Sequence, residues 1–290
     1  MDPPATDPYA GWQPPVSQCY QHPDRVAGAV CRRCGRPICP DCMREAPVGW
    51  QCATCVRSDS RQAPVTRWRP RRPGTLGNSR LTPVTTGLIA LNVVIYLIES
   101  RHLAADEYRF GLVPYLVHAR SEWYRLLTAA FLHASITHVL FNMLTLAIVG
   151  PAVESAIGRV RFGALYLLAA LGGSTASYLA SPQLTIGVGA SGAIFGVMGG
   201  YFVLARRNGW EISNIGGLIV MNLVISFIDP AIDWRAHVGG VVTGAVVALG
   251  MAVAAARPGA VRWWGAVATS GAVLAVLALL TRLPPGHLNL

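Results

Sequence analysis

The chain has 290 residues, of which 52% are hydrophobic and only 13% are charged, and its formal net charge is +10. With a positive mean hydropathy of +0.41, this composition excludes an ordinary soluble domain and predicts a polytopic membrane protein. The basic residues, 24 in all and every one an arginine, are concentrated before residue 81. Arginines beside a membrane act as a topology signal and contact anionic lipid, so we do not expect nucleic acid as a partner.

The N-terminal region carries a regular set of metal-ligand residues. Residues 1–17 are proline-rich without periodicity and are predicted to be disordered. Residues 18–56 hold four pairs with one spacing: Cys19-x-x-His22, Cys31-x-x-Cys34, Cys39-x-x-Cys42 and Cys52-x-x-Cys55. Zinc takes four such ligands, so eight predict two zinc ions. A disulfide framework is the alternative, but it would leave one of the seven cysteines unpaired.

The short, interleaved gaps favour a cross-braced pairing of these ligands. One ion would be held by Cys19, His22, Cys39 and Cys42, and the other by Cys31, Cys34, Cys52 and Cys55. Sequential pairing is the alternative. The segment resembles a B-box-type zinc finger, although its spacings depart from the usual ones. Four protein ligands leave no open coordination position, so we predict structural zinc and a surface for a protein partner.

Residues 57–82 are predicted to be a basic linker that approaches the lipid bilayer. Its arginines surround Trp68 or follow it: Arg67, Arg69, Arg71, Arg72 and Arg80.

From residue 83 to 282 apolar runs alternate with short polar breaks, and a helix of about 20 residues crosses the ~30 Å hydrocarbon layer. The fold class is therefore an all-α polytopic membrane protein, followed by a short tail, 283–290. Seven spans are predicted, at 84–99, 135–156, 160–180, 187–205, 213–228, 234–255 and 262–280.

Arginines in the breaks predict the orientation of these spans in a cell membrane. The N-terminal region and three breaks would share the cytoplasmic side; these breaks contain Arg159 and Arg161, Arg206 and Arg207, and Arg257 and Arg262. The opposite, outer side would receive the long segment 100–134, two uncharged or proline-containing turns and the C-terminus. Arginines in 100–134 oppose this orientation, so it depends on the other breaks.

Four polar residues fall at one depth near the outer face. His138 and Asn142 lie early in the second span, Ser191 early in the fourth and His237 at the start of the sixth. Polar groups inside a membrane are costly and usually face a bundle interior or a wet cavity. Singly, each would be explained by a bond to its own helix or by packing, but their coincidence on three helices predicts a shared site.

The residue types indicate nucleophilic catalysis. A serine hydroxyl needs a base to take its proton, which a neutral imidazole can do, and glycine stripes would let the fourth and sixth spans approach closely. The Ser191 amide and the side chains of His138 and Asn142 could stabilise an oxyanion. No third member is predicted to orient His237, since Asp233 is better explained as a turn residue or helix cap.

Residues 84–256 closely resemble the rhomboid intramembrane serine proteases, and the seventh run fits family forms with an extra C-terminal helix. The resemblance is carried by Gly189-Ala190-Ser191-Gly192, by Ala236-His237-Val238-Gly239-Gly240, and by the segment His133–His138 that leads to Asn142. Glu122-Trp123-Tyr124-Arg125 resembles the family's first-loop signature, in which an arginine stabilises a partly embedded hairpin.

The resemblance implies a bundle of six core spans plus a seventh, and a Ser191–His237 dyad without an acid or a catalytic cofactor. It also implies an oxyanion hole of His138, Asn142 and the Ser191 amide, supported by Gly189 and Gly192, with Phe195 stacked on His237 and a structural His133. The expected activity is hydrolysis of peptide bonds in or near transmembrane segments of protein substrates. The alternative is an inactive relative that binds and escorts membrane proteins.

Overall fold

The computed structural model describes residues 17–46, 49–62, 81–210, 212–230, 232–256 and 261–286, with the backbone alone for 59–62, 213–215 and 261–263. The chain divides into two compact units, residues 1–67 and 68–290. Several predicted features lie outside the described residues: the lead-in up to residue 16, the linker around Trp68 with Arg67, Arg69, Arg71, Arg72 and Arg80, the break residue Arg257, and tail residues 287–290.

The N-terminal unit consists of two small hairpins and one helix. Strand β1 (Ala29–Val30) pairs with β2 (Pro37–Ile38), and β3 (Met43–Glu45) pairs with β4 (Trp50–Cys52), both antiparallel. A 3-10 turn η1 (Pro40–Cys42) joins the hairpins, and α1 (Ala53–Gln62) follows β4. The buried core contains Ile38 and five cysteines but few other apolar groups. So small a core needs additional cross-links to be stable.

The second unit is a helix bundle, which confirms the predicted fold class. Long helices occur at each of the seven predicted positions: α2 (Pro83–Glu99), α6 (Ile136–Ile157), α7 (Arg159–Ala180), α8 (Ser191–Asn208), α9 (Ser213–Ile228), α10 (Trp234–Ala255) and α11 (Val261–Leu280). Within the described residues, α6, α7 and α10 are long and apolar enough to cross a membrane, and α2, α9 and α11 contain shorter apolar stretches.

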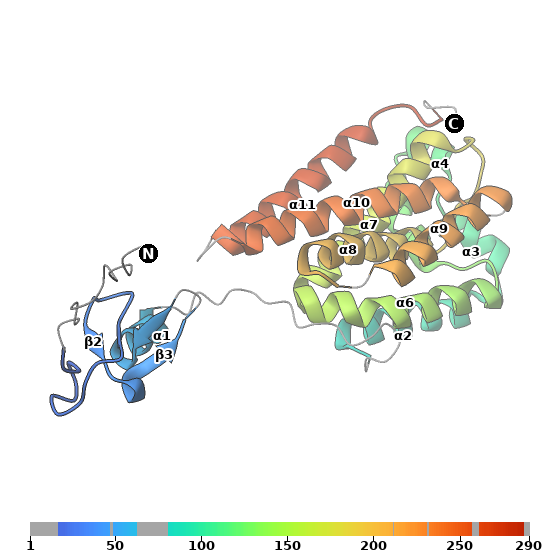
Figure 1. Ribbon diagram of the computed structural model, residues 1–290. Coiled ribbons are helices and arrows are strands. Elements are labelled where there is room, and N and C mark those ends of the chain that lie inside the picture. Colours follow the sequence, from blue (N-terminus) through green and yellow to red (C-terminus); the bar gives the residue numbers. More distant parts are fainter. Residues whose placement is uncertain are drawn as a thin grey trace, which may run out of the picture. The chain divides into compact units, whose positions relative to one another are not determined.

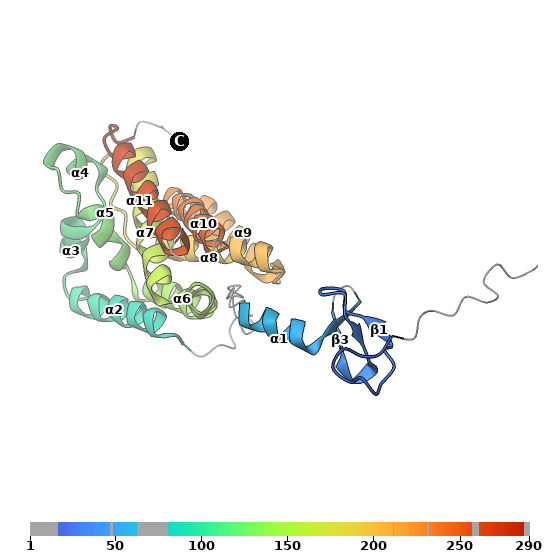
Figure 2. The same cartoon turned by 90° about the vertical axis from the view of Figure 1, so that its left-hand side faces the viewer.

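Helix α8 is largely enclosed by its neighbours in the bundle. Most of its residues are buried, and it packs against α10, α7 and α6. Figures 1 and 2 show α11 running along α10, while α2 lies beside α6 on another side of the bundle. Four of the α8 residues are glycines, Gly192, Gly196, Gly199 and Gly200. Their missing side chains allow backbones to approach closely, as membrane helices require where no hydrophobic force drives them together.

A buried carboxylate connects α2 to α6. Glu154 of α6 is 2% exposed and accepts hydrogen bonds from the backbone N–H groups of Val84 (3.0 Å) and Thr85 (2.8 Å) at the start of α2. The first N–H groups of a helix have no partner inside the helix and favour a negative charge. An acidic residue within an apolar helix is thereby accommodated.

The fourth predicted span begins later than expected, at Ser191 and not at residue 187. Gly187 exchanges two backbone hydrogen bonds of 2.9 Å with Leu112, and Gly189 donates its N–H to the carbonyl of Ala129. These bonds hold the chain extended, and Gly189 has a φ of +132°, which is incompatible with a helix. Ser191 therefore becomes the first residue of α8.

The long segment 100–134 has its own structure. It contains α3 (Leu103–Phe110), α4 (Pro114–Arg120), α5 (Arg125–Thr128) and a 3-10 turn η2 (Ala129–Phe131). Arg125 is 3% exposed and donates to the carbonyls of Tyr108 and Gly111, each at 2.8 Å, and to Glu122 at 2.6 Å. The bond from Arg125 lowers the pKa of Glu122. The Arg125 guanidinium, which has several donors, thus connects Tyr108, Gly111 and Glu122 of this segment by hydrogen bonds.

Candidate functional site

The polar residues singled out in the sequence lie at the N-terminal ends of three helices. Ser191 is the first residue of α8, and His237 lies in the first turn of α10. His138 and Asn142 lie in the first two turns of α6, where Ser135 caps the helix by accepting a hydrogen bond of 3.1 Å from the His138 N–H. Asp233 caps α10 by accepting from the N–H groups of Arg235 and Ala236. These caps fix where both helices begin.

The hydroxyl of Ser191 and the imidazole of His237 are in contact. Ser191 Oγ lies 2.8 Å from His237 Nε2, a hydrogen-bond distance, although the residues are 46 positions apart in the chain. His237 is 5% exposed, while Ser191 is half-buried. The ring of Phe195, one turn after Ser191, stacks on the imidazole with centroids 4.1 Å apart and planes 14° apart. Phe195 therefore packs on the face of the imidazole, and Ser191 contacts its Nε2 at the edge.

His138, one of the residues considered for an oxyanion hole, lies near Ser191 across Gly189. His138 Nε2 and Ser191 Oγ lie 2.8 and 3.6 Å from the point where a Cβ on Gly189 would stand, so only glycine fits between them. Asn142 donates one amide hydrogen to the His138 carbonyl at 2.9 Å and has a second hydrogen on the same nitrogen. Because Ser191 begins α8, its backbone N–H has no acceptor within the helix.

Gly192 lies in the packing interface next to this centre. A Cβ on Gly192 would be 3.3 Å from the carbonyl oxygen of Ala236 in α10 and 3.6 Å from the Cα of Gly173 in α7. The three helices therefore meet one residue after the serine. Such close packing holds the beginnings of α8 and α10 together, which keeps Ser191 beside His237.

Two nearby groups have other partners. The carboxylate of Asp233 caps α10 and accepts a hydrogen bond from Ser177 Oγ, in agreement with the cap predicted for it. His133 is fully buried, and its backbone N–H donates to the Glu99 carboxylate at 2.9 Å, while its ring packs edge-on against the ring of His138 at a centroid distance of 5.2 Å. His133 thus supports the ring of His138 from behind.

One contact of the imidazole was missed in the sequence. Ser226 of α9 is 2% exposed, and its Oγ lies 2.7 Å from His237 Nδ1. A serine within an apolar helix normally bonds its own backbone, and no motif surrounds this one. Sequence reasoning therefore had no signal that would distinguish Ser226 from any other serine in the spans.

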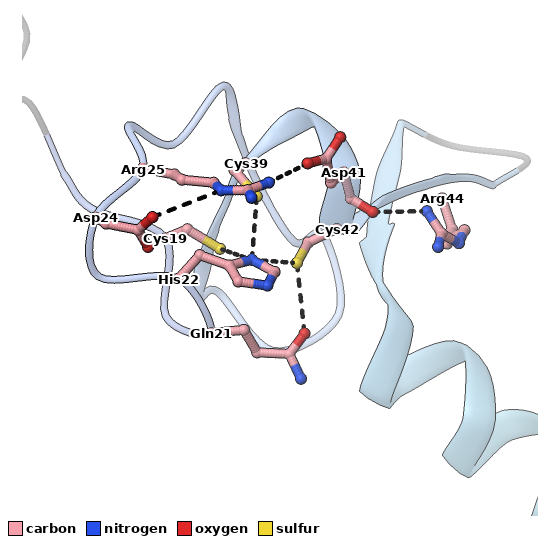
Figure 3. A network of polar contacts seen from close by, with 9 residues as sticks. All are labelled: Cys19, Gln21, His22, Asp24, Arg25, Cys39, Asp41, Cys42 and Arg44. Carbon is pink, nitrogen blue, oxygen red and sulfur yellow. Dashed lines mark hydrogen bonds and ion pairs between the residues drawn. The ribbon is translucent and has the colours of Figure 1, made fainter.

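The N-terminal unit gathers the eight ligand-type residues into two groups. Cys19, His22, Cys39 and Cys42 form one group, and Cys31, Cys34, Cys52 and Cys55 form the other. The ligand atoms of each group lie within 4.8 Å of one another. This grouping is the cross-braced one, and Figure 3 shows the first group converging around His22.

The spacing of these atoms fits a tetrahedral ion. Zn–S bonds of about 2.3 Å in a tetrahedron separate neighbouring sulfurs by about 3.8 Å, and sulfur from nitrogen by slightly less. His22 Nδ1 lies 3.9, 3.4 and 3.3 Å from the sulfurs of Cys19, Cys39 and Cys42. In the second group the sulfurs of Cys34 and Cys52 are 3.8 Å apart. Both groups could thus hold a metal ion.

Fold and site together define a class: a multi-pass membrane helix bundle in which a serine and a histidine are in contact at the N-terminal ends of two helices. Residues 120–254 match the family model described as the rhomboid domain. YdcA of Bacillus subtilis (strain 168) is 38% identical over 174 residues, which are 57% of this chain and 86% of YdcA. The chain therefore belongs to the rhomboid family.

Other relatives extend the comparison. The chain is 41% identical over 154 residues to rhomboid protease GluP of Bacillus subtilis (strain 168), covering 51% of this chain but only 30% of GluP. It is 26% identical over 201 residues to rhomboid protease AarA of Providencia stuartii, covering 57% of this chain and 71% of AarA. The matches to YdcA, GluP and AarA each cover little more than half of this chain.

Proposed function

We propose that the protein is an intramembrane serine endopeptidase in which Ser191 is the nucleophile and His237 the general base. The observation that carries this proposal is the 2.8 Å contact between Ser191 Oγ and His237 Nε2, in a bundle whose relatives GluP and AarA are named rhomboid proteases. A serine hydroxyl beside a neutral imidazole is the minimal arrangement that activates a hydroxyl.

The reaction follows from the positions of these groups. Ser191 Oγ attacks the peptide carbonyl while its proton passes to His237 Nε2, and the negative charge develops on the carbonyl oxygen. The backbone N–H of Ser191 and the side chains of His138 and Asn142 would donate to that oxygen. His237 then gives its proton to the leaving amine. In the second half of the reaction water attacks the acyl carbon and gives a proton to His237 Nε2, and His237 returns this proton to Ser191 Oγ as the ester bond breaks.

The proposed substrates are transmembrane segments of other membrane proteins. A peptide bond within a helix is shielded because its backbone groups bond to each other, so the substrate must unwind locally before attack. Segments with small or helix-destabilising residues at the cleavage site meet this requirement at the lowest cost.

The site is proposed to open toward the outer side of the membrane. It lies at the N-terminal ends of α6, α8 and α10, while Arg206 and Arg207 lie at the C-terminal end of α8 and Arg159 at the junction of α6 with α7. Arginines favour the cytoplasmic side. This orientation would also place the N-terminal unit in the cytoplasm.

The proposal is tested with the purified full-length chain reconstituted with a membrane-anchored reporter protein. We expect cleavage of the reporter within or next to its transmembrane segment, and covalent labelling of Ser191 by a fluorophosphonate probe. The second candidate, an inactive escort factor, predicts reporter binding without either product. An intact reporter and an unlabelled chain would therefore favour the escort function and contradict the protease.

For the N-terminal unit we propose two structural zinc ions. Three cysteines with one histidine, as in the first group, and four cysteines, as in the second, are both ligand sets that zinc prefers, and four protein ligands leave neither site an open coordination position. Backbone N–H groups also point at the sulfurs: Cys52 N–H lies 3.2 Å from Cys31 Sγ, and Cys55 N–H lies 3.4 Å from Cys52 Sγ. Such bonds stabilise thiolates. The role proposed for the unit is to present a surface to a protein partner.

Elemental analysis of the full-length chain should find about two zinc ions per chain. His22→Ala removes one ligand of the first group, so its zinc content should fall to about one, because a site with three ligands binds much more weakly. Val26→Ala is the control from the same unit and should keep both ions, because Val26 is 62% exposed and is not one of the eight ligand-type residues. A wild-type chain without zinc, or a chelator that leaves the proteolysis pattern of residues 17–62 unchanged, would contradict the assignment.

A further inference from the structure

Ser226 is a buried polar residue that the proposed reaction does not use. It lies on α9, and its hydroxyl makes two short contacts: 2.6 Å to the backbone carbonyl of Asn222, one turn earlier, and 2.7 Å to His237 Nδ1. Both contacts are well within hydrogen-bond range. Since the side chain is 2% exposed, water does not compete for its hydroxyl.

The direction of both bonds follows from the atoms involved. A hydroxyl carries a single proton, and a carbonyl oxygen can only accept. Two oxygens 2.6 Å apart require a proton between them, so the Ser226 hydroxyl donates to the Asn222 carbonyl. Its lone pairs then face His237, and Nδ1 must be the nitrogen that carries the proton. In a neutral imidazole this leaves Nε2 as an acceptor, facing Ser191 Oγ at 2.8 Å.

The opposite arrangement would disable the base. If Nε2 carried the proton, it would donate to Ser191 and could not accept the serine's proton. The nearest acidic side chain along α10 does not choose the tautomer, because Asp233 is bonded to the start of α10 and to Ser177. Phe195 contacts the face of the ring and selects neither nitrogen. Among the residues that the structure describes, Ser226 is the side chain within hydrogen-bond distance of His237 Nδ1.

We propose that Ser226 is a positioning residue that holds His237 in its Nδ1-protonated tautomer and fixes the ring plane. The inference rests on the proposed function, since it assigns the third member of the same site. When Ser191 loses its proton to Nε2, both ring nitrogens carry hydrogens, and Nδ1 continues to donate to Ser226 Oγ. The Asn222 carbonyl keeps Ser226 oriented throughout, so no other proton has to move.

Ser226→Ala tests the inference in the full-length chain in lipid bilayers. Without an acceptor at Nδ1 the imidazole can occupy the unproductive tautomer, so we expect labelling of Ser191 by a fluorophosphonate to slow by about 10- to 100-fold. For reporter cleavage we expect kcat to fall by the same factor with KM nearly unchanged, because Ser226 does not lie at the substrate-facing nitrogen. Ser226→Thr retains a hydroxyl and should restore most of the rate.

The matched control is Thr145→Ala on α6. Thr145 also donates its hydroxyl to the carbonyl four residues earlier, that of Phe141, at 2.8 Å. Its loss removes the same kind of helix contact away from His237, so labelling should proceed at the wild-type rate. Thermal unfolding of each variant, measured in parallel, separates an effect on the base from an effect on folding.

A direct readout that needs no activity is nitrogen NMR of ¹⁵N-histidine-labelled chain, with the His237 signals identified by their loss in His237→Asn. We expect a protonated Nδ1 and an unprotonated Nε2 in the wild type, and a mixture of tautomers in Ser226→Ala. A wild type protonated at Nε2 would overturn the inference, even if Ser226→Ala fails to fold. Equal labelling rates in wild type and Ser226→Ala would overturn it as well, while leaving the protease intact. A wild type that is never labelled would count against the protease alone.

Discussion

Ser191→Ala should reduce reporter cleavage by at least about 10³-fold and abolish fluorophosphonate labelling. The substitution removes the hydroxyl of the proposed nucleophile while leaving the imidazole, Phe195 and the helix interface in place. Because Ser191 is half-buried and its side chain contributes a single hydrogen bond to His237, we expect the unfolding temperature to change little. Cleavage, labelling and thermal unfolding are measured on the same reconstituted preparation.

The control for this experiment is Ser100→Ala. Ser100 is an exposed serine after α2 whose hydroxyl bonds the carbonyl of Leu97, so its loss should leave the cleavage rate unchanged. His237→Asn should cost about as much as Ser191→Ala, and the double variant should lose nothing further, because residues that act as one unit are not additive. Residual cleavage by Ser191→Ala near the wild-type rate would contradict a serine nucleophile.

Helix positions could be read from the sequence because a span needs a fixed length of apolar residues, and seven such runs are separated by arginines or prolines. The start of the fourth helix could not be predicted in this way. The residues just before Ser191 continue the apolar composition, but Gly187 exchanges backbone hydrogen bonds with Leu112, and Gly189 donates its N–H to the carbonyl of Ala129, so the helix does not begin there. Leu112 and Ala129 lie more than 50 residues before these glycines in the sequence, so the local pattern of apolar residues cannot reveal the hydrogen bonds.

The short helices of residues 100–134 escaped prediction for a related reason. Arg125 appears in the sequence as one arginine among several, yet it is almost fully buried and bonds the carbonyls of Tyr108 and Gly111. An ion of that size inside a membrane protein is accommodated only by its partners. Composition reveals the charge but not the carbonyls that surround it.

The candidate site could likewise be predicted only in part from the sequence. Ser191, His237, His138 and Asn142 could be singled out because polar residues are rare in spans and these fall at one depth. Ser226 is equally buried, but it lies on a helix whose contribution depends on how α9 is rotated against α10. That rotation is determined by side-chain packing between the helices, which cannot be predicted from the sequence of α9 alone. The cross-braced grouping of the eight ligands, in contrast, was already favoured by the short gaps between the pairs.

Gly244→Ala should slow the reaction by about 10²-fold, although Gly244 is not a residue of the site. A Cβ on Gly244 would lie 2.0 Å from the carbonyl oxygen of Gly196 and 2.5 Å from its Cα, both backbone atoms of α8. No rotamer change relieves such a contact, so α10 would have to move away from α8 by more than 1 Å to reach ordinary van der Waals separation. His237 lies on α10, two turns before Gly244, and a shift of this size would break its 2.8 Å bond to Ser191.

Misplacement of a reacting group by about 1 Å costs on the order of 10²-fold in rate, and overpacking costs about 1–3 kcal/mol of stability or more. Both losses should appear together, as slower labelling of Ser191 and a lower unfolding temperature. Gly271→Ala on α11 and Gly163→Ala on α7 are the matched controls, since a Cβ at either position has no neighbour within 4 Å. Alanine stabilises a helix relative to glycine, so these variants should be as active as the wild type and at least as stable. If Gly244→Ala behaved as they do, α8 and α10 could not be in backbone contact, and the pairing of Ser191 with His237 would lose the geometry that supports it.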